Sequence, residues 1–284
     1  SLGEPARARE NYDQALAIRE QLRRRAPDSA EYARDLSVSY ERLGDLYVRL
    51  GEPARALENY DQALAIHEQL RRRAPDSAEY ARDLSVSYNK LGDLYVSFGE
   101  PARALQYYEQ SLATAEELRR RAPDSAENAR DLSISYERLG DLYVSLGEPA
   151  RALENYDQAL AIREQLRRRA PDSAEYARDL SVSYERLGDL YVRLGEPARA
   201  RSYHEQALAI AEELRRRAPD SAEYACDLVA LFQRLATIHE QTGNPAKARR
   251  YWSRCLETLR AMEAAGMYMD APLVELLHKL SDGR

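Results

Sequence analysis

The histidines are the residues of this 284-residue chain whose type best suits acid–base or metal chemistry; they are His67, His204, His239 and His278. None has a histidine, cysteine or carboxylate at metal-ligand spacing on the same helical turn, so we predict no metal site. His204 and His239 replace tyrosines of a repeated pattern, which favours a packing role. His67 replaces an arginine found in other copies and is expected to be solvated.

The two cysteines are Cys226 and Cys255. Two cysteines in a chain of this length do not form a disulfide framework, which predicts a reducing compartment and a cytoplasmic location. If they lie on antiparallel helices that turn near Gly243, they are staggered by about five residues at a rise of about 1.5 Å per residue. That offset disfavours a disulfide between them.

Motifs typical of enzymes are absent from the sequence: there is no glycine-rich phosphate loop, no nucleophile elbow and no His-Glu-x-x-His. The glycines fall at expected helix ends or packing sites. We therefore predict that the chain is not an enzyme and has no catalytic residues and no cofactor. No apolar run approaches the roughly 18 residues of a membrane span, so no membrane partner is predicted.

Charged and polar residues recur at intervals of 48 residues, as rows along one face of equivalent helices. The candidate protein-binding residues are Glu41, Arg42, Asp45 and Arg49 in the first copy, Asn89, Lys90 and Asp93 in the second, Glu137, Arg138 and Asp141 in the third, and Glu185, Arg186, Asp189 and Arg193 in the fourth. One interpretation is a groove of alternating acidic and basic rows that grips a partner segment. The alternative is a solvated helix face with local ion pairs worth about a few tenths of a kcal/mol each.

Three consecutive arginines also recur, at 23–25, 71–73, 119–121, 167–169 and 215–217. They could form a basic stripe for phosphate groups. Alternatively, they place positive charge at helix C-termini beside the acidic start of the next unit. No aromatic residue is interleaved with them, and the formal net charge is -6. Both observations favour the alternative and argue against a nucleic-acid partner.

The position of all these residues depends on a repeat with a period of 48 residues. The stretch 40–60 returns at 88–108, 136–156 and 184–204, and in altered form at 232–252. A fixed period of this size indicates a stacked array in which each unit contacts only its neighbours.

The spacing within the repeat is Tyr40-x2-Leu43-Gly44-x2-Tyr47, followed by Gly51, Ala56, Tyr60 and Ala63. It resembles the tetratricopeptide repeat (TPR) family. The repeat exceeds the family's usual length of about 34 residues and is similar to the long repeats of kinesin light chain. The resemblance implies an all-α fold, a right-handed α-solenoid of TPR-like antiparallel helix pairs. It also implies binding of peptides or protein surfaces on the concave face lined by each first helix.

Each unit is predicted to contain two helices of roughly 20 residues joined by a Gly-Glu-Pro turn. The stretch from Asp28 to Glu31 indicates a capping box at the start of the first helix. Gly44 lies in a helix interior, which indicates close approach of a neighbouring helix. Ala56 and Ala63 would supply the matching flat surface.

We expect an unpaired second-type helix of a truncated repeat at 1–27. Five repeats follow at 28–75, 76–123, 124–171, 172–219 and 220–265, and a C-terminal capping helix at 266–284. The chain opens on a sequence found within the repeat, so we expect a further first helix upstream.

The predicted function is a protein–protein interaction scaffold that binds a partner peptide or protein surface along the first-type helices. The alternative is a cis-regulatory or oligomerisation arm of a larger protein with its effector domain upstream. Homotypic stacking through the N-terminal end is a further possibility.

Overall fold

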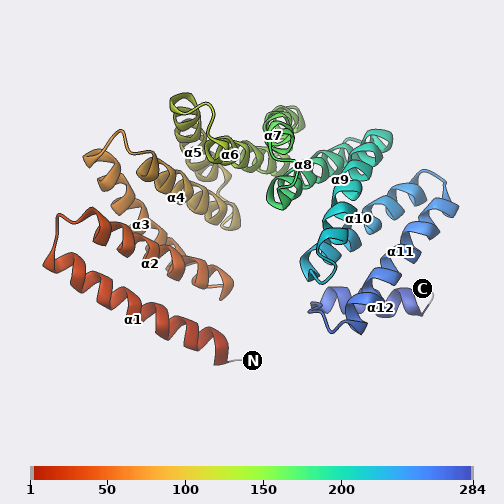
Figure 1. The fold of residues 1–284 in the computed structure, drawn as a ribbon, viewed down its shortest axis with the longest axis horizontal. Helices are drawn as coiled ribbons and strands as arrows, with labels where there is room; N and C mark the ends of the chain where they lie inside the picture. The colour runs from red at the N-terminus through yellow and green to blue at the C-terminus, as the bar shows by residue number, and fades with distance from the viewer. Residues whose placement is uncertain (1–2, 283–284) are drawn as a thin grey trace. The chain divides into compact units, whose positions relative to one another are not determined.

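The computed structural model describes residues 3–282, which form twelve α-helices and no strand (Figure 1). The first-type helices are α2 (Ala30–Arg49), α4 (Ala78–Ser97), α6 (Ala126–Ser145), α8 (Ala174–Arg193) and α10 (Ala222–Gln241). The second-type helices are α1 (Gly3–Arg25), α3 (Pro53–Arg73), α5 (Pro101–Arg121), α7 (Pro149–Arg169), α9 (Pro197–Arg217) and α11 (Pro245–Ala264). The short helix α12 (Ala271–Ser281) follows. The fold is the predicted all-α solenoid of helix pairs.

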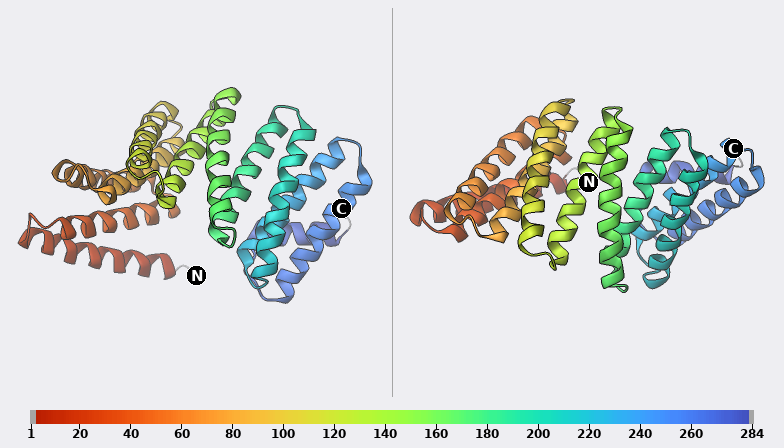
Figure 2. Two further views of the ribbon diagram at one scale, coloured as in Figure 1. Left: turned by 45° about the horizontal axis from the view of Figure 1, so that its top comes forward. Right: turned by 90° about the horizontal axis from the view of Figure 1, so that it is seen from above.

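The chain divides into two compact units, residues 1–148 and 149–284. The first contains α1 to α6 and the second α7 to α12, and within each unit every helix packs against the next one along the chain (Figures 1 and 2). The division falls between the two helices of the predicted third repeat.

The N-cap residue of each first-type helix is a serine rather than the predicted aspartate. The side chain of Ser29 accepts a hydrogen bond from the backbone N–H of Tyr32 at 3.2 Å, and the equivalent serines do the same in the other copies. The predicted capping box is therefore wrong by one residue, because Ser29 has the extended backbone that a cap requires. Asp28 lies outside the helix with a fully exposed side chain.

The turn within each helix pair follows the prediction. Gly51 has φ of +70°, a left-handed conformation that glycine adopts without strain. Pro53 then occupies the first turn of α3, where its missing N–H leaves no intrahelical hydrogen bond unmade.

Close approach of the paired helices occurs at the predicted glycine, but its partner is an aromatic ring. A methyl group on Gly44 would lie 2.3 Å from Cε1 of Tyr60, and one on Gly92 would lie 2.3 Å from the same atom of Tyr108. The expectation that alanines meet this glycine is wrong, because the tyrosine ring covers the gap between the helices. In the fifth copy, Ala236 takes the place of the glycine and Trp252 the place of the tyrosine.

This contact gives a first test. Gly92→Ala is expected to lower the free energy of unfolding by about 1–3 kcal/mol, because the new methyl group overlaps the buried ring of Tyr108. Chemical denaturation followed by circular dichroism measures the loss. In the Tyr108→Ala background the same substitution should cost much less, because the overlapping ring is gone. Equal losses in both backgrounds would show that the ring is not the cause.

Candidate functional site

The predicted charged rows lie on the first-type helices, where they pair with one another between successive repeats. Lys90 of α4 forms an ion pair with Asp45 of α2. One repeat further, Nη1 of Arg138 lies 2.8 Å from Oδ1 of Asp93. Each basic residue therefore neutralises the aspartate of the preceding repeat.

The same pairing recurs in the second unit, where one arginine holds two carboxylates. Arg234 of α10 donates to Asp189 at 3.0 Å and to Glu185 at 3.0 Å. Burial raises the pKa of Glu185 to about 7, although the nearby Arg234 lowers it. The ion pairs link successive repeats as well as facing the predicted groove.

The remaining predicted residues differ in their surroundings. Arg42, Arg49 and Arg193 are exposed. Asn89 is half-buried, and its side-chain oxygen has no hydrogen-bond partner. Glu137, Asp141 and Arg186 are each engaged in further interactions.

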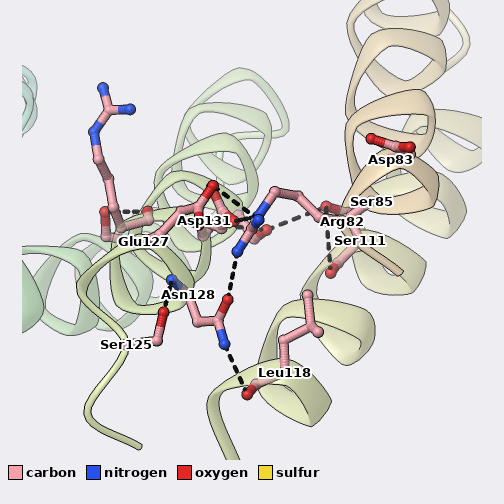
Figure 3. A network of polar contacts seen from close by, with 12 residues as sticks. Arg82, Asp83, Ser85, Ser111, Leu118, Ser125, Glu127, Asn128 and Asp131 are labelled. Atoms are coloured by element: carbon pink, nitrogen blue, oxygen red, sulfur yellow. Dashed lines mark hydrogen bonds and ion pairs between the residues drawn. The ribbon is translucent and has the colours of Figure 1, made fainter. Parts of the chain in front are cut away.

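A second series of ion pairs joins the opposite ends of the same helices (Figure 3). Arg82 of α4 donates to Asp131 at 2.8 Å and to Asn128 at 2.7 Å, both on α6. Asn128 in turn donates to the carbonyl of Leu118 at 3.1 Å, so the network reaches the intervening helix α5. The helices α4 and α6 are thus linked at two levels along their length.

Pockets lie between successive first-type helices, beside the ion pairs. One of about 370 Å³ between α4 and α6 is lined by Asp93, Val96, Tyr108, Arg138, Asp141, Leu142 and Ser145. Its counterpart between α8 and α10 has a volume of about 390 Å³ and is lined by Asp189, Val192, His204, Ala230, Gln233, Arg234, Thr237, Ile238 and Gln241. In each unit, we call the surface around its pocket the groove of that unit.

Sequence reasoning missed the valines of the groove. Val96 and Val192 line the two pockets and are 41% and 40% exposed, and Val48 at the equivalent position of α2 is 48% exposed. Their common 48-residue register was visible in the sequence. Exposure of a valine on one face of a helix cannot be read from the sequence, whereas charged rows indicate a surface directly.

The burial of the histidines agrees with the sequence prediction for two of them and contradicts it for a third. His204 and His239 are buried, as expected from packing positions. The expectation of a solvated His67 is wrong: it is 2% exposed, and Arg163 at the equivalent position is 3% exposed. This position faces a serine of the next first-type helix, so Nδ1 of His67 lies 2.7 Å from Ser87 Oγ, and Arg163 donates to Ser183 Oγ at 2.9 Å.

Ser87, His67 and Glu41 together contain the residue types of a hydrolase triad. Ser87 Oγ donates to Glu41 at 3.3 Å, and burial lowers the pKa of His67. However, the serine and histidine are both 2% exposed, so no substrate can reach the hydroxyl. The carboxylate also binds the serine rather than orienting the histidine, unlike a catalytic triad. The cluster is a buried polar link between α2, α3 and α4.

Cys226 and Cys255 are free thiols. Burial raises the pKa of Cys255 to about 12, so its thiol stays protonated and is a poor nucleophile. Among the residues the structure describes, no group of three or more histidine, cysteine or carboxylate side chains is arranged to hold a metal ion.

The arginine triplets are engaged within the chain. Arg71 donates to the carbonyl of Pro75 in its own loop, and Arg72 pairs with Glu68 at 3.5 Å. Arg73 reaches Asp28, at the start of the same repeat, at 3.6 Å. These contacts favour the interpretation of the triplets as helix-end charges.

Comparison with known families gives a match to the tetratricopeptide repeat over residues 40–117 and 131–213, more than half of the chain. The chain belongs to the tetratricopeptide repeat family. The TPR fold is that of a protein-interaction scaffold. Residues 184–267 also match a family described only as a protein of unknown function. The search of curated proteins found no match.

Solved structures share the TPR solenoid fold. BtubC (BKLC) from P. vanneervenii has a TM-score of 0.71 at 21% identity, over 94% of each chain. Nearly identical TPR-like repeats of a Podosopora anserina putative kinesin light chain give a TM-score of 0.57 at 18% identity, over 80% of this chain and 95% of that one. PilW, a type IV pilus biogenesis factor, gives 0.55 at 19% identity, over 95% and 91%. These likenesses show the fold alone.

Along the TPR helices that the structure describes, no helix has both the length and the apolar character needed to cross a lipid bilayer.

The fourth TPR unit carries His204 where the first three units carry tyrosine. The hydroxyls of Tyr60 and Tyr108 donate to Asp45 and Asp93 at 2.8 and 2.6 Å. His204 Nε2 lies 3.5 Å from Asp189, and neither ring nitrogen has a hydrogen-bond partner. Burial lowers the pKa of His204 from 6.5 to about 4.

Replacing this histidine tests the arrangement. His204→Tyr is expected to raise the free energy of unfolding by about 1 kcal/mol, because the new hydroxyl would donate to Asp189. The pH dependence should change too. The unfolded state takes up the histidine proton first, so this part of the stability is complete above pH 6.5 and lost as pH falls toward 4.

Denaturation at several pH values measures both effects, and the His204→Tyr variant should lack this part of the acid sensitivity. The opposite substitution in the second repeat, Tyr108→His, should introduce the same loss of stability at acid pH. A variant whose acid profile matched that of the parent would show that His204 does not cause the loss.

Proposed function

We propose that the groove of each unit binds a segment of a protein partner, and that an apolar side chain of this segment enters the pocket between two successive first-type helices. The observation that carries the proposal is the half-exposed valine that lines each pocket. Val96 and Val192 occupy equivalent positions in the two pockets, one in each unit.

The ion pairs beside the pockets support an apolar partner rather than a charged one. Asp93 and Asp189 are already held by arginines of the following repeat, so a charged partner would have to compete with existing ion pairs. An apolar side chain meets no such competition. It gains free energy at about 25 cal/mol for each Å² of apolar surface that it removes from water.

The ion pairs then have a different role from the one that the sequence suggested. They line the pocket of each unit and link the two first-type helices that flank it. A partner would be recognised by apolar side chains that fit the pockets, and the polar rim would add specificity.

Substitutions in the groove test this function. The double variant Val96→Asp, Val192→Asp should reduce affinity for a captured partner about tenfold or more, because a carboxylate in each pocket rejects the apolar side chain. Leu146→Asp is the matched control, since Leu146 is 38% exposed but lies outside both pockets.

The measurement is capture from a native extract, with contacts located by cross-linking and mass spectrometry. Only three lysines are present among 42 basic residues, so the cross-linker should react with carboxylates. A partner retained equally by the parent chain and the double variant would contradict the groove assignment.

A further inference from the structure

Clusters of aromatic side chains lie between successive second-type helices, on a different surface from the groove. In the first unit, Tyr88 of α4 faces Tyr107 of α5, beside Glu68 of α3. We call this cluster slot 1; Gln110 of α5 stands at its edge.

Two equivalent clusters occur in the second unit. Slot 2 consists of Glu164, Tyr184, Tyr203 and Gln206, at positions 96 residues after those of slot 1. Slot 3 consists of Glu212, Phe232, Tyr251 and Arg254, a further 48 residues along. Slot 3 therefore differs from the other two by an arginine in place of glutamine and a phenylalanine in place of tyrosine.

The aromatic pair has the same geometry in all three slots. The ring centroids are 6.2 Å apart at 38° in slot 1, 6.2 Å at 36° in slot 2 and 6.3 Å at 32° in slot 3. The ring pair therefore has the same geometry with glutamine at the edge of the slot, as in slots 1 and 2, and with arginine, as in slot 3.

Slot 3 contains a guanidinium group from its own chain. The guanidinium of Arg254 lies 4.4 Å from the ring centroid of Phe232, and its Nη2 donates to Glu212 at 2.5 Å. The group thus stacks on an aromatic face and forms a charge-assisted hydrogen bond with a carboxylate. Together, the ring and the carboxylate bind the guanidinium group at this position.

Slots 1 and 2 have the ring and the carboxylate but not the arginine. Slot 1 opens on a cavity of about 400 Å³. Its Glu68 is 41% exposed and meets Arg72 of the same helix only at 3.5 Å. In slot 2, Glu164 is 39% exposed, accepts a hydrogen bond from the hydroxyl of Tyr184 at 3.3 Å and lies 3.7 Å from Arg168. Both carboxylates are accessible to a further cation.

We propose that slots 1 and 2 each bind the guanidinium group of an arginine side chain from a protein partner, in the position that Arg254 takes in slot 3. Arginine suits the site better than lysine, because its planar group stacks on a ring while its N–H groups reach a carboxylate. Arg103 lines the same cavity but lies over Tyr95 at 5.3 Å. Arg103 therefore does not occupy the position over the Tyr88 ring that the partner's guanidinium would take.

The first repeat shows what a slot requires. Asn59 stands there at the position of Tyr107, and it donates to the carbonyl of Arg55 in its own helix at 2.8 Å. The second ring of the pair is therefore missing in the first repeat. We assign arginine binding to the slots that have both rings.

The test uses N-acetyl-arginine methylamide as the probe and the full chain as the receptor, with saturation-transfer difference NMR as the readout. The arginine probe is expected to give a signal and the corresponding lysine derivative a much weaker one. The variant Gln110→Arg, Gln206→Arg fills both open slots with the chain's own guanidinium, as in slot 3. Its signal should fall to the level of the lysine probe.

Two further variants make the result specific. Arg254→Gln opens slot 3, and with three open slots against two it should raise the signal about 1.5-fold by mass action. The control Ala102→Arg, Ala198→Arg adds the same charge at exposed positions about 12 Å along α5 and α9, at about 1.5 Å per residue. It should leave most of the signal.

An equal signal from the lysine probe would overturn the proposal, as would full retention by the Gln110→Arg, Gln206→Arg variant. No increase with Arg254→Gln, in a variant whose circular dichroism matches that of the parent chain, would also contradict it. The groove and the slots share no residue, so failure here leaves the proposed function of the groove untouched.

Discussion

The contact between a glycine of the first-type helix and the ring that covers it, at Gly44, Gly92 and Gly188, is the constraint on which the rest of the structure depends. Tyr60 reaches its position only because Gly44 has no side chain. From there its hydroxyl donates to Asp45, and this aspartate also pairs with Lys90 of the next repeat. A single contact inside one helix pair therefore positions the group that links that pair to its neighbour.

Much of the fold was predictable from the sequence, because a strict period constrains many residues at once. The two helices of each unit, the Gly-Glu-Pro turn and the short terminal helix follow from local rules of capping and helix propensity. The cap was misplaced by one residue, because Asp28 and Ser29 are both good capping residues and only the backbone conformation distinguishes them.

The candidate site was harder to predict, because its contacts join residues of different repeats. Lys90 and Asp45 are 45 residues apart, and nothing within one repeat shows that stacking brings them together. His67 was misjudged for a related reason: its partner Ser87 lies on the next helix pair, so the helix taken alone shows a polar residue with no reason to be buried.

The pairing of each basic residue with the aspartate one repeat earlier has a consequence for how such a chain can evolve. Near-identical 48-residue units are prone to unequal recombination, which adds or removes whole units. Each added copy of the common type brings both its own aspartate and its own basic residue, so the ladder of ion pairs closes again at the new junctions. The fifth copy has Thr237 where the others have aspartate, and a unit inserted after it would find no acceptor. A unit inserted before the fifth copy would therefore keep an acceptor for its basic residue, whereas one inserted after it would not.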